Sequence, residues 1–228
     1  MANSSGATYC LLHGNWHDGS CWAPLVDTLH ARGAAVLTPD LPFDDASADY
    51  ATRAQPALDA LAGVDDPVVI VAHSVSSAEG ALVAAQRRPS LLVYLCPRFG
   101  SFPVPDDAPD VFQPGFPWPP RDEEGRSVWE PEAAVAAMYP RVPDELGAEH
   151  AQRLHPGAQP VGDFPLGEHP DVPTALIYTT EDEFFRPEWE QYVARDILGI
   201  EPVELPGGHF PMLEDPERLA DVLVALSS

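Results

Sequence analysis

The sequence predicts an α/β fold with a mostly parallel, doubly wound sheet, because short apolar runs alternate with helical stretches along most of the chain. The run at 68–72 is apolar throughout, as expected for a strand that is buried on both faces of a sheet. We expect six strands, at residues 9–13, 34–39, 68–72, 91–96, 174–179 and 202–205. Helices are expected at residues 21–32, 50–62, 76–87, 187–198 and 216–225.

One long segment, residues 97–173, interrupts this alternation and is rich in proline, most densely at 102–120. It contains two expected helices, at 131–139 and 143–154. A connection of this length is unusual, so we interpret it as a cap over the carboxyl ends of the strands, where open α/β sheets bind ligands. A disordered spacer is the alternative, which Trp129 and Tyr139 disfavour because such spacers are poor in aromatic residues. We therefore expect a core in two parts, 1–97 and 174–228, with a cap insertion at 98–173.

The composition limits the class of protein and its partners. A chain of 228 residues is long enough for one well-packed domain. Its formal charge of −24 repels nucleic acid and anionic membranes, so we expect a small-molecule substrate and neither of these as partners. Cys10, Cys21 and Cys96 are scattered, without the spacing of a metal site or a disulfide framework, which favours a reducing compartment.

A cytoplasmic location is expected, because residues 1–6 lack the pattern of a secretory signal and no apolar run reaches transmembrane length. The high alanine and proline content suggests a bacterial source. Neither a cofactor nor a metal is expected: the stretch from His13 to Gly19 is not a nucleotide-binding glycine loop, and His13 and His17 lack a third ligand. The oligomeric state, monomer or dimer, stays open.

The segment around Ser74 carries the strongest functional signal. The apolar run at 68–72 stops at His73-Ser74 and an alanine-rich helical stretch follows, which is the pattern of a nucleophile elbow. In such an elbow, a tight strand-to-helix turn exposes a serine hydroxyl above the sheet, and the serine needs a general base and an acid that orients the base. His209 is the candidate base and Asp182 the candidate acid, and they follow Ser74 in the chain order known for this motif.

Each of these residues also has a simpler interpretation. Ser74 is a residue type that is common at helix N-termini. Asp182 lies between two glutamates, Glu181 and Glu183, in an acidic protein, and the chain has eight histidines. We favour His209 as the base because it follows a strand end and two glycines, whereas His13 and His73 are expected to shape the site.

Four segments together resemble the α/β-hydrolase superfamily over nearly the whole chain, and they occur in the order expected for it. They are Leu11-Leu12-His13-Gly14-Asn15-Trp16-His17-Asp18-Gly19-Ser20-Cys21-Trp22, the elbow His73-Ser74, Tyr178-Thr179-Thr180-Glu181-Asp182, and Gly208-His209-Phe210-Pro211-Met212-Leu213-Glu214-Asp215-Pro216. The chain resembles most closely the small-lid branch that contains plant methyl esterases and hydroxynitrile lyases. The resemblance implies an α/β-hydrolase fold that lacks the family's first antiparallel strands. It also implies Asp182 as the acid, and an oxyanion hole made by the backbone N–H groups of Asn15 and Val75.

Two departures from the family pattern bear on function. The family elbow has glycine on both sides of the serine, two residues away, where this chain has Ala72 and Ser76. These are the next smallest residues, so we expect the turn to form with its geometry shifted. After the fourth expected strand, Arg98 and its neighbours replace the apolar-acidic sequence common in this branch, which leaves the substrate class open.

The hypothesis that results is a serine hydrolase that cleaves a carboxylic ester or thioester of a small to medium apolar substrate through an acyl-enzyme. Substrate contacts are expected from an apolar set, for each of which core packing is the alternative: Trp16, Phe99, Trp118, Met138 and Phe210. The altered elbow leaves two further hypotheses open. One is a lyase or cyclase that uses the same three residues for proton transfer, and the other is a non-catalytic ligand-binding protein.

Overall fold

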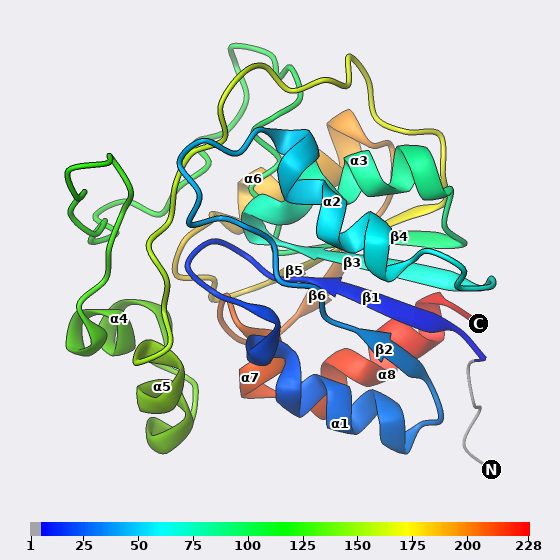
Figure 1. Cartoon of the computed structure of the whole chain (residues 1–228), viewed down its shortest axis with the longest axis horizontal. Coiled ribbons are helices and arrows are strands. Elements are labelled where there is room, and N and C mark those ends of the chain that lie inside the picture. Colours follow the sequence, from blue (N-terminus) through cyan, green and yellow to red (C-terminus); the bar gives the residue numbers. More distant parts are fainter. Residues whose placement is uncertain (1–5) are drawn as a thin grey trace.

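The computed structural model describes residues 6–228, and within them it contains a six-stranded sheet with the strand order β2-β1-β3-β4-β5-β6 (Figure 1). The strands are β1 (Thr8–Leu12), β2 (Ala35–Leu37), β3 (Val68–His73), β4 (Leu91–Leu95), β5 (Thr174–Thr179) and β6 (Val203–Leu205). All neighbouring strands pair in parallel, which confirms the predicted fold class. Every residue of the central strands β3 and β4 is buried, because helices cover both faces of the sheet.

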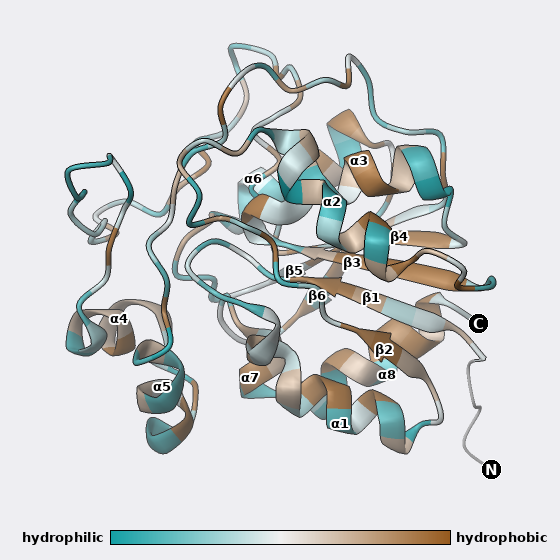
Figure 2. Cartoon of the chain, viewed as in Figure 1, coloured by the Kyte–Doolittle hydropathy of each residue, from teal (hydrophilic) through white to brown (hydrophobic). Residues whose placement is uncertain are grey.

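The helices form two layers. On one face lie α1 (Ala23–Ala31) and α8 (Pro216–Leu226), and on the other lie α2 (Tyr50–Ala60), α3 (Ser77–Arg87) and α6 (Pro187–Tyr192) (Figure 1). Successive residues of β1 alternate between two hydrophobic cores: Tyr9 and Leu11 belong to the core with α1 and α8, and Cys10 and Leu12 to the core with α2 and α3. Figure 2 shows the strands as hydrophobic along most of their length. The result is a platform buried on both sides, whose carboxyl edge carries the functional loops.

The predicted helices are present, with three differences. The helix expected at 21–32 starts as a 3-10 turn, Gly19–Trp22, whose N-terminus the Asp18 carboxylate caps by accepting the Ser20 N–H at 2.8 Å. The helix expected at 187–198 is divided into α6 and a π-helical turn, Val193–Ile197. The short helix α7 (Pro211–Glu214) is absent from the prediction, since four residues are too few to show a helical period.

The segment between β4 and β5 adds no strand to the sheet, and it contains α4 (Pro131–Met138) and α5 (Asp144–Ala151). Its helices α4 and α5 lie at the end of the molecule where the strands terminate, on the left of Figure 1, and its last part runs over the top of the view back to the start of β5. Two hydrogen bonds illustrate how it is attached: the Gln113 N–H donates to the Phe184 carbonyl at 2.8 Å, and Trp16 Nε1 donates to Ser127 Oγ at 2.9 Å. Among residues 6–228 no helix has both the length and the apolar character needed to cross a bilayer.

Candidate active site

Ser74 stands at the turn between β3 and α3, at the carboxyl edge of the sheet. Its φ angle is +60°, a left-handed conformation that is unfavourable for serine and persists only when the surroundings hold it. One such restraint is the hydrogen bond from the Arg98 N–H to the Ser74 carbonyl, at 3.1 Å, which ties the turn to the loop after β4. Ser74 is 7% exposed and lines a cavity. The strained turn is therefore present despite the altered elbow sequence.

Backbone strain is concentrated at this edge of the sheet. Besides Ser74, positive φ angles occur at Trp16 (67°), Cys96 (45°) and Phe99 (52°), in the loops that follow β1 and β4. Conformations of this kind cost free energy, and they cluster where a protein fixes groups for binding or chemistry.

The missing elbow glycines are compensated by Gly80, one helical turn further along α3. A Cβ atom at Gly80 would lie only 2.5 Å from the Ala72 Cβ, so the helix can approach β3 this closely only because residue 80 is glycine. Ser76, at the position of the second family glycine, contributes through hydrogen bonds. Its hydroxyl lies 3.0 Å from the Leu12 carbonyl and 2.8 Å from the His73 carbonyl. The turn is thus built from a different set of small residues than the family pattern.

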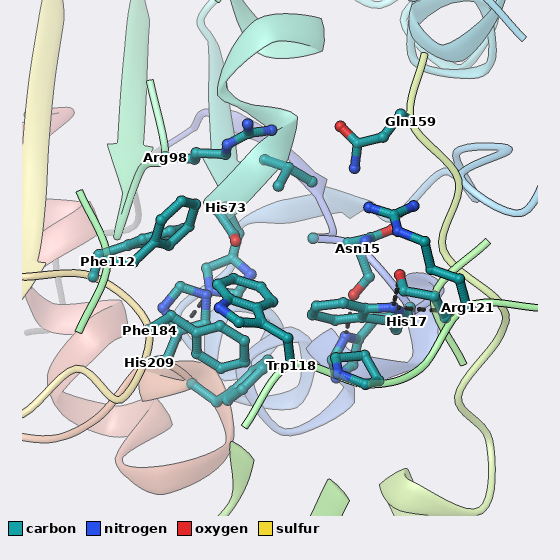
Figure 3. A pocket seen from close by; sticks show the side chains of 18 residues that line it. Asn15, His17, His73, Arg98, Phe112, Trp118, Arg121, Gln159, Phe184 and His209 are labelled. Carbon is teal, nitrogen blue, oxygen red and sulfur yellow. Dashed lines mark hydrogen bonds between the residues drawn. The ribbon is translucent and has the colours of Figure 1, made fainter. Parts of the chain in front are cut away.

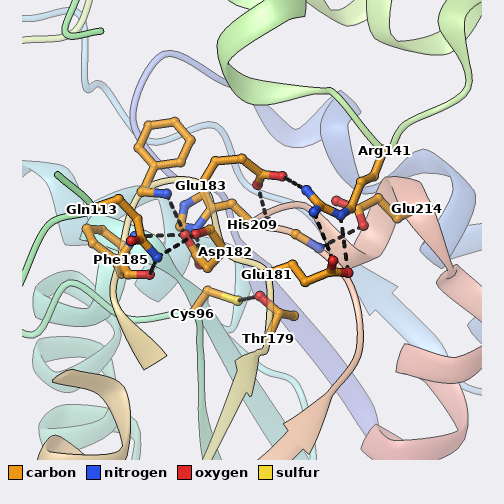
Figure 4. Close-up of polar contacts among 12 residues, drawn as sticks. Cys96, Gln113, Arg141, Thr179, Glu181, Asp182, Glu183, Phe185, His209 and Glu214 are labelled. Atoms are coloured by element: carbon orange, nitrogen blue, oxygen red, sulfur yellow. Dashed lines mark hydrogen bonds and ion pairs between the residues drawn. The ribbon is translucent and has the colours of Figure 1, made fainter. Parts of the chain in front are cut away.

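His209 and Asp182 form a buried pair beside the turn (Figure 4). His209 Nδ1 lies 2.6 Å from Asp182 Oδ2, and the two side chains are 2% and 0% exposed. Because a carboxylate only accepts hydrogen bonds, Nδ1 carries the hydrogen, which leaves Nε2 as the basic nitrogen. The other carboxylate oxygen, Asp182 Oδ1, accepts the backbone N–H groups of Phe184 and Phe185 at 2.7 and 2.8 Å. The pair therefore satisfies the geometry of an oriented imidazole base.

The two glutamates that flank Asp182 point elsewhere. Glu181 forms an ion pair with Arg141 at 3.0 Å, and Glu183 also pairs with Arg141. Glu183 Oε2 accepts the backbone N–H of His209 at 2.9 Å, so this residue fixes the backbone of the histidine and not its ring. Of the three adjacent acids, Asp182 is the one whose carboxylate contacts the imidazole (Figure 4).

Histidines pack around the pair in a neutral form. The rings of His73 and His209 have centroids 4.6 Å apart, and His73 Nε2 donates to the His209 carbonyl at 2.8 Å. Burial lowers the pKa of His73 well below its usual value and that of His17 to about 3. His73 and His17 therefore stay uncharged at neutral pH. Both line the cavity, and of the two only His73 is expected from the sequence to shape the site.

A cavity of about 390 Å³ opens above the turn (Figure 3). Ser74 and His209 both line it, together with Asn15 and Val75, whose backbone N–H groups are the expected oxyanion donors. The remaining lining residues divide into an aromatic group, which is Trp16, Phe112, Trp118, Phe184, Phe185 and Phe210, and a polar group that includes His17, His73, Arg98, Arg121, Ser127 and Gln159. A cavity of this size and character is typical of a site for a small molecule.

Three of the five expected substrate contacts lie on the cavity wall, namely Trp16, Trp118 and Phe210. Phe99 does not: it is 1% exposed and packs against Tyr94 and Phe102 in the core on the side of α2 and α3. Met138 does not either, because it is fully buried in the opposite core, within α4. The expectation for these two residues is corrected accordingly.

Several lining residues went unnoticed in the sequence. Phe184 and Phe185 directly follow Asp182, and their rings lie 4.5 and 5.1 Å from the His209 ring, so their position next to the acid was an available signal. Glu190, which does not line the cavity, has no such signal in the sequence. It is fully buried, and neither of its carboxylate oxygens has a hydrogen-bond partner among the described residues. Burial, with a smaller contribution from Asp182, raises the pKa of Glu190 well above its usual value, so it is neutral.

One group of potential metal ligands occurs in the part of the chain that the structure describes. Cys96, Asp182 and His209 each place a ligand atom within 4.8 Å of the others. Burial raises the pKa of the Cys96 thiol well above its usual value, which keeps it protonated, and the thiolate is the form that binds metal. Asp182 and His209 are moreover hydrogen-bonded to each other, so the arrangement fits an acid–base pair better than a metal centre.

A strained turn above an apolar cavity, at the carboxyl edge of a doubly wound sheet, places the protein among α/β enzymes that act on small molecules. A profile described as the alpha/beta hydrolase family matches residues 11–222. The chain therefore belongs to the α/β-hydrolase family. A search of curated protein sequences finds no match.

Solved structures with the same fold include hydrolases and esterases. A pyrethroid hydrolase from Sphingobium faniae JZ-2 is 21% identical, with a TM-score of 0.73 and 97% of each chain covered. A methylesterase from Arabidopsis is 17% identical, with a TM-score of 0.74, and 96% of this chain and 98% of that chain are covered. Polyneuridine aldehyde esterase is 19% identical, with a TM-score of 0.76 and coverage of 98% and 100%. At these identities the likeness establishes the shared fold, which agrees with the resemblance to the small-lid branch.

Proposed function

We propose that the protein is a serine hydrolase that cleaves a carboxylic ester or thioester through a Ser74-His209-Asp182 triad. The observation that carries this proposal is the buried Asp182–His209 pair, at 2.6 Å, on the same cavity as the strained Ser74. A serine hydroxyl is a weak nucleophile at neutral pH, and a neighbouring imidazole that is held in one tautomer provides the base it lacks.

The reaction proceeds in two halves. Ser74 Oγ attacks the carbonyl carbon of the substrate while His209 Nε2 takes the hydroxyl proton, and the N–H groups of Asn15 and Val75 bind the developing oxyanion. The C–O or C–S bond then breaks, and His209 gives its proton to the leaving group, which leaves an acyl-enzyme. Water, deprotonated by His209, attacks the acyl carbon, and the proton returns to Ser74 as the acid departs. Asp182 stays ionised and stabilises the imidazolium that forms in each half.

The cavity indicates a substrate of small to medium size with an apolar body. Its volume of about 390 Å³ and its aromatic wall, which includes Trp16 and Phe184, suit an acyl or aryl group. Residues 98–173 act as a cap in this proposal, since Phe112, Trp118 and Ser127 of this segment complete the cavity. The related structures described above are a pyrethroid hydrolase, a methylesterase and an aldehyde esterase, which supports ester hydrolysis for the present chain.

Labelling with a fluorophosphonate tests the nucleophile directly. The probe should modify Ser74, as located by mass spectrometry, and the Ser74→Ala variant should lose the label. Ser90→Ala is the matched control, because Ser90 is an exposed serine at the opposite edge of the sheet, before β4. A folded protein that takes up no label would contradict the mechanism.

A series of p-nitrophenyl esters of increasing acyl length tests the reaction and the size of the cavity together. We expect turnover that falls by about 10⁴-fold or more in Ser74→Ala, because covalent catalysis is lost. Measurable activity retained in Ser74→Ala would instead favour a lyase or cyclase, which needs no acyl-enzyme. No turnover of any ester, combined with tight ligand binding, would favour a binding protein.

A further inference from the structure

The arginines of this chain fall into two groups. The chain contains no lysine, so its 12 arginines face 36 acidic residues. Within residues 6–228, most of them form ion pairs with aspartate or glutamate side chains, namely Arg32, Arg87, Arg126, Arg141, Arg153, Arg186, Arg195 and Arg218. The others, Arg53, Arg88, Arg98 and Arg121, form no ion pair with a described residue. An arginine without an acidic partner is the exception in so acidic a protein. Arg98 and Arg121 line the active-site cavity, and Arg53 lies directly behind it, whereas Arg88 lies elsewhere.

Arg98 is fixed next to the proposed nucleophile. Its backbone N–H donates to the Ser74 carbonyl at 3.1 Å, and its carbonyl accepts Trp189 Nε1 at 3.0 Å. The side chain is half-buried and lines the cavity, yet its guanidinium has neither a hydrogen bond nor an ion pair with any residue that the structure describes. A half-buried guanidinium without a partner is poorly solvated, and it gains from any anion that enters the cavity.

Arg121 reaches the cavity from the opposite side, out of the segment between β4 and β5. It pairs with Ser127 across a small antiparallel bridge, and Ser127 Oγ accepts Trp16 Nε1 at 2.9 Å, which anchors this bridge to the core. One guanidinium nitrogen donates to the Gly125 carbonyl at 2.5 Å. No other described residue accepts a hydrogen bond from it, so most of its donors remain available to a ligand.

Polar and aromatic side chains are unevenly distributed over the cavity wall. In Figure 3, Gln159, Asn15 and Arg121 lie on the right and Arg98 lies on the upper left, above Phe112, while Phe184 and Trp118 lie to the left and below. A guanidinium offers planar N–H pairs that match a carboxylate, and a neighbouring amide adds a further donor. The aromatic wall suits the apolar body of a substrate, and the polar wall suits a charged end.

A smaller polar cavity behind this wall adds a third positive charge. It shares Asn15, Arg98 and Gln159 with the main cavity and contains Arg53, which is 2% exposed and whose Nε has no partner among the described residues. Glu79 also lines it, but burial raises the pKa of Glu79 to about 7, which reduces its negative charge at neutral pH. The local field therefore favours an anion although the protein as a whole carries a charge of −24.

We infer that the substrate carries an anionic group, a carboxylate, which Arg98 and Arg121 bind while the aromatic wall holds the apolar body. This inference rests on the proposed hydrolase function and narrows its substrate to esters or thioesters that bear a negative charge away from the scissile bond. A neutral ester of the same size fills the aromatic side and leaves both guanidinium groups unpaired.

Two esters that differ only in this charge provide the test. Mono-p-nitrophenyl glutarate carries a carboxylate where p-nitrophenyl valerate has a methyl group. We expect kcat/KM to favour the glutarate, and this preference to fall about tenfold or more in Arg98→Gln and Arg121→Gln, mainly through KM, and further in the double variant. Arg88→Gln is the matched control, because Arg88 also lacks an ion pair but lies outside the cavity. A glutarate-to-valerate ratio that is the same in the double variant and the wild type would overturn the inference.

Binding separates this inference from the proposed function. In Ser74→Ala, titration calorimetry should show the glutarate ester binding more tightly than the valerate ester, with an advantage that weakens at high ionic strength and is lost when both arginines are replaced. If the wild type hydrolyses neither ester but the glutarate ester binds in this arginine-dependent way, the hydrolase proposal fails and the anion site stands. If the wild type hydrolyses both esters and the arginines make no difference, the anion site fails and the hydrolase proposal stands.

Discussion

The loops at the carboxyl edge of the sheet and the segment that covers them are built in different ways. The edge loops follow strands that are buried on both faces, and they hold strained backbones at Trp16 and Ser74. Residues 98–173 contain two short helices and add no strand. Scattered hydrogen bonds, such as that from Trp16 Nε1 to Ser127 Oγ, and buried apolar side chains, such as Met138, attach them to the core. The edge loops thus hold the proposed reacting groups in fixed positions, whereas the covering segment supplies one wall of the cavity.

Because the two regions are built differently, we expect each of them to control a different kinetic constant. A group that a strained turn holds between buried elements acts in the transition state, where a small displacement of the group lowers the rate strongly. A wall that carries none of the three proposed triad residues acts mainly on substrate binding. We therefore expect substitutions at the edge to lower kcat and substitutions in the covering segment to raise KM, and the following predictions are ordered by the size of the expected effect.

The largest effect is expected for Asp182→Asn. The amide cannot hold the His209 Nδ1–H as the carboxylate does, which favours the wrong tautomer, and kcat should fall by about 10⁴-fold with KM little changed. Steady-state kinetics on a p-nitrophenyl ester measure this loss. Glu181→Gln is the matched control, since the Glu181 carboxylate is half exposed and pairs with Arg141 instead. Equal losses in both variants would contradict the assignment of the acid.

The second effect is a change of stability with pH. Burial raises the pKa of Glu79 from its ordinary 4.5 to about 7, so the folded state binds a proton that the unfolded state has released between these pH values. The resulting stabilisation is present below pH 4.5 and is lost as the pH rises to about 7. Relative to Glu79→Gln, the wild type should therefore lose on the order of 3 kcal/mol of unfolding free energy across this window.

Urea unfolding at pH 4.5 and pH 8 measures this difference between the two proteins. Buried histidines such as His17 titrate in both proteins and cancel in the comparison. Glu123→Gln, an exposed acid of the covering segment, should show no such pH dependence. Parallel stability curves for the wild type and Glu79→Gln would show that Glu79 is ionised throughout.

The sequence predicts the strands and helices of both regions well, including α4 and α5, and the direction of loop side chains poorly, and the reason is physical. Parallel strands that are buried on both faces appear as short apolar runs, and the turn at Ser74 needs small residues in a fixed order. Which way a side chain turns in an irregular loop depends on its φ angle and its neighbours. Phe99, with a φ of +52°, packs into the core and not into the cavity, and no local pattern distinguishes the two outcomes.

The compensation of the missing elbow glycines by Gly80 also cannot be recognised from the sequence alone. The absence of glycine at Ala72 and Ser76 suggests a shifted elbow, because the family pattern contains glycine there. The close approach between helix and strand is provided by Gly80, which is recognised only when the contact with Ala72 is known. Arg98 and Arg121 likewise become neighbours of one cavity only through the fold.

A third prediction tests this compensation. Gly80→Ala places a Cβ atom 2.5 Å from the Ala72 Cβ, and such overpacking should cost about 1–3 kcal/mol of stability and reduce kcat, because the turn at Ser74 shifts. The double variant Ala72→Gly with Gly80→Ala removes the clash and should restore most of the loss. Gly167→Ala is the control, since its Cβ would meet no atom within 4 Å. A double variant no more stable than Gly80→Ala would show that the contact does not limit the packing.

The smallest effect is expected in the covering segment. Ser127→Ala removes one acceptor of Trp16 Nε1, at 2.9 Å, and one donor to the Gly157 carbonyl, at 3.0 Å, while the Ser127 carbonyl remains within 3.2 Å of the indole. The expected cost is about 1 kcal/mol, and because this bond anchors a cavity wall, KM should rise several-fold with kcat nearly constant. Ser101→Ala, in the same segment but without a bond to Trp16, should leave both constants unchanged. A fall in kcat alone would mean that loss of this hydrogen bond displaces the proposed reacting groups through Trp16. The expectation that the edge loops control kcat and the covering segment controls KM would then be wrong.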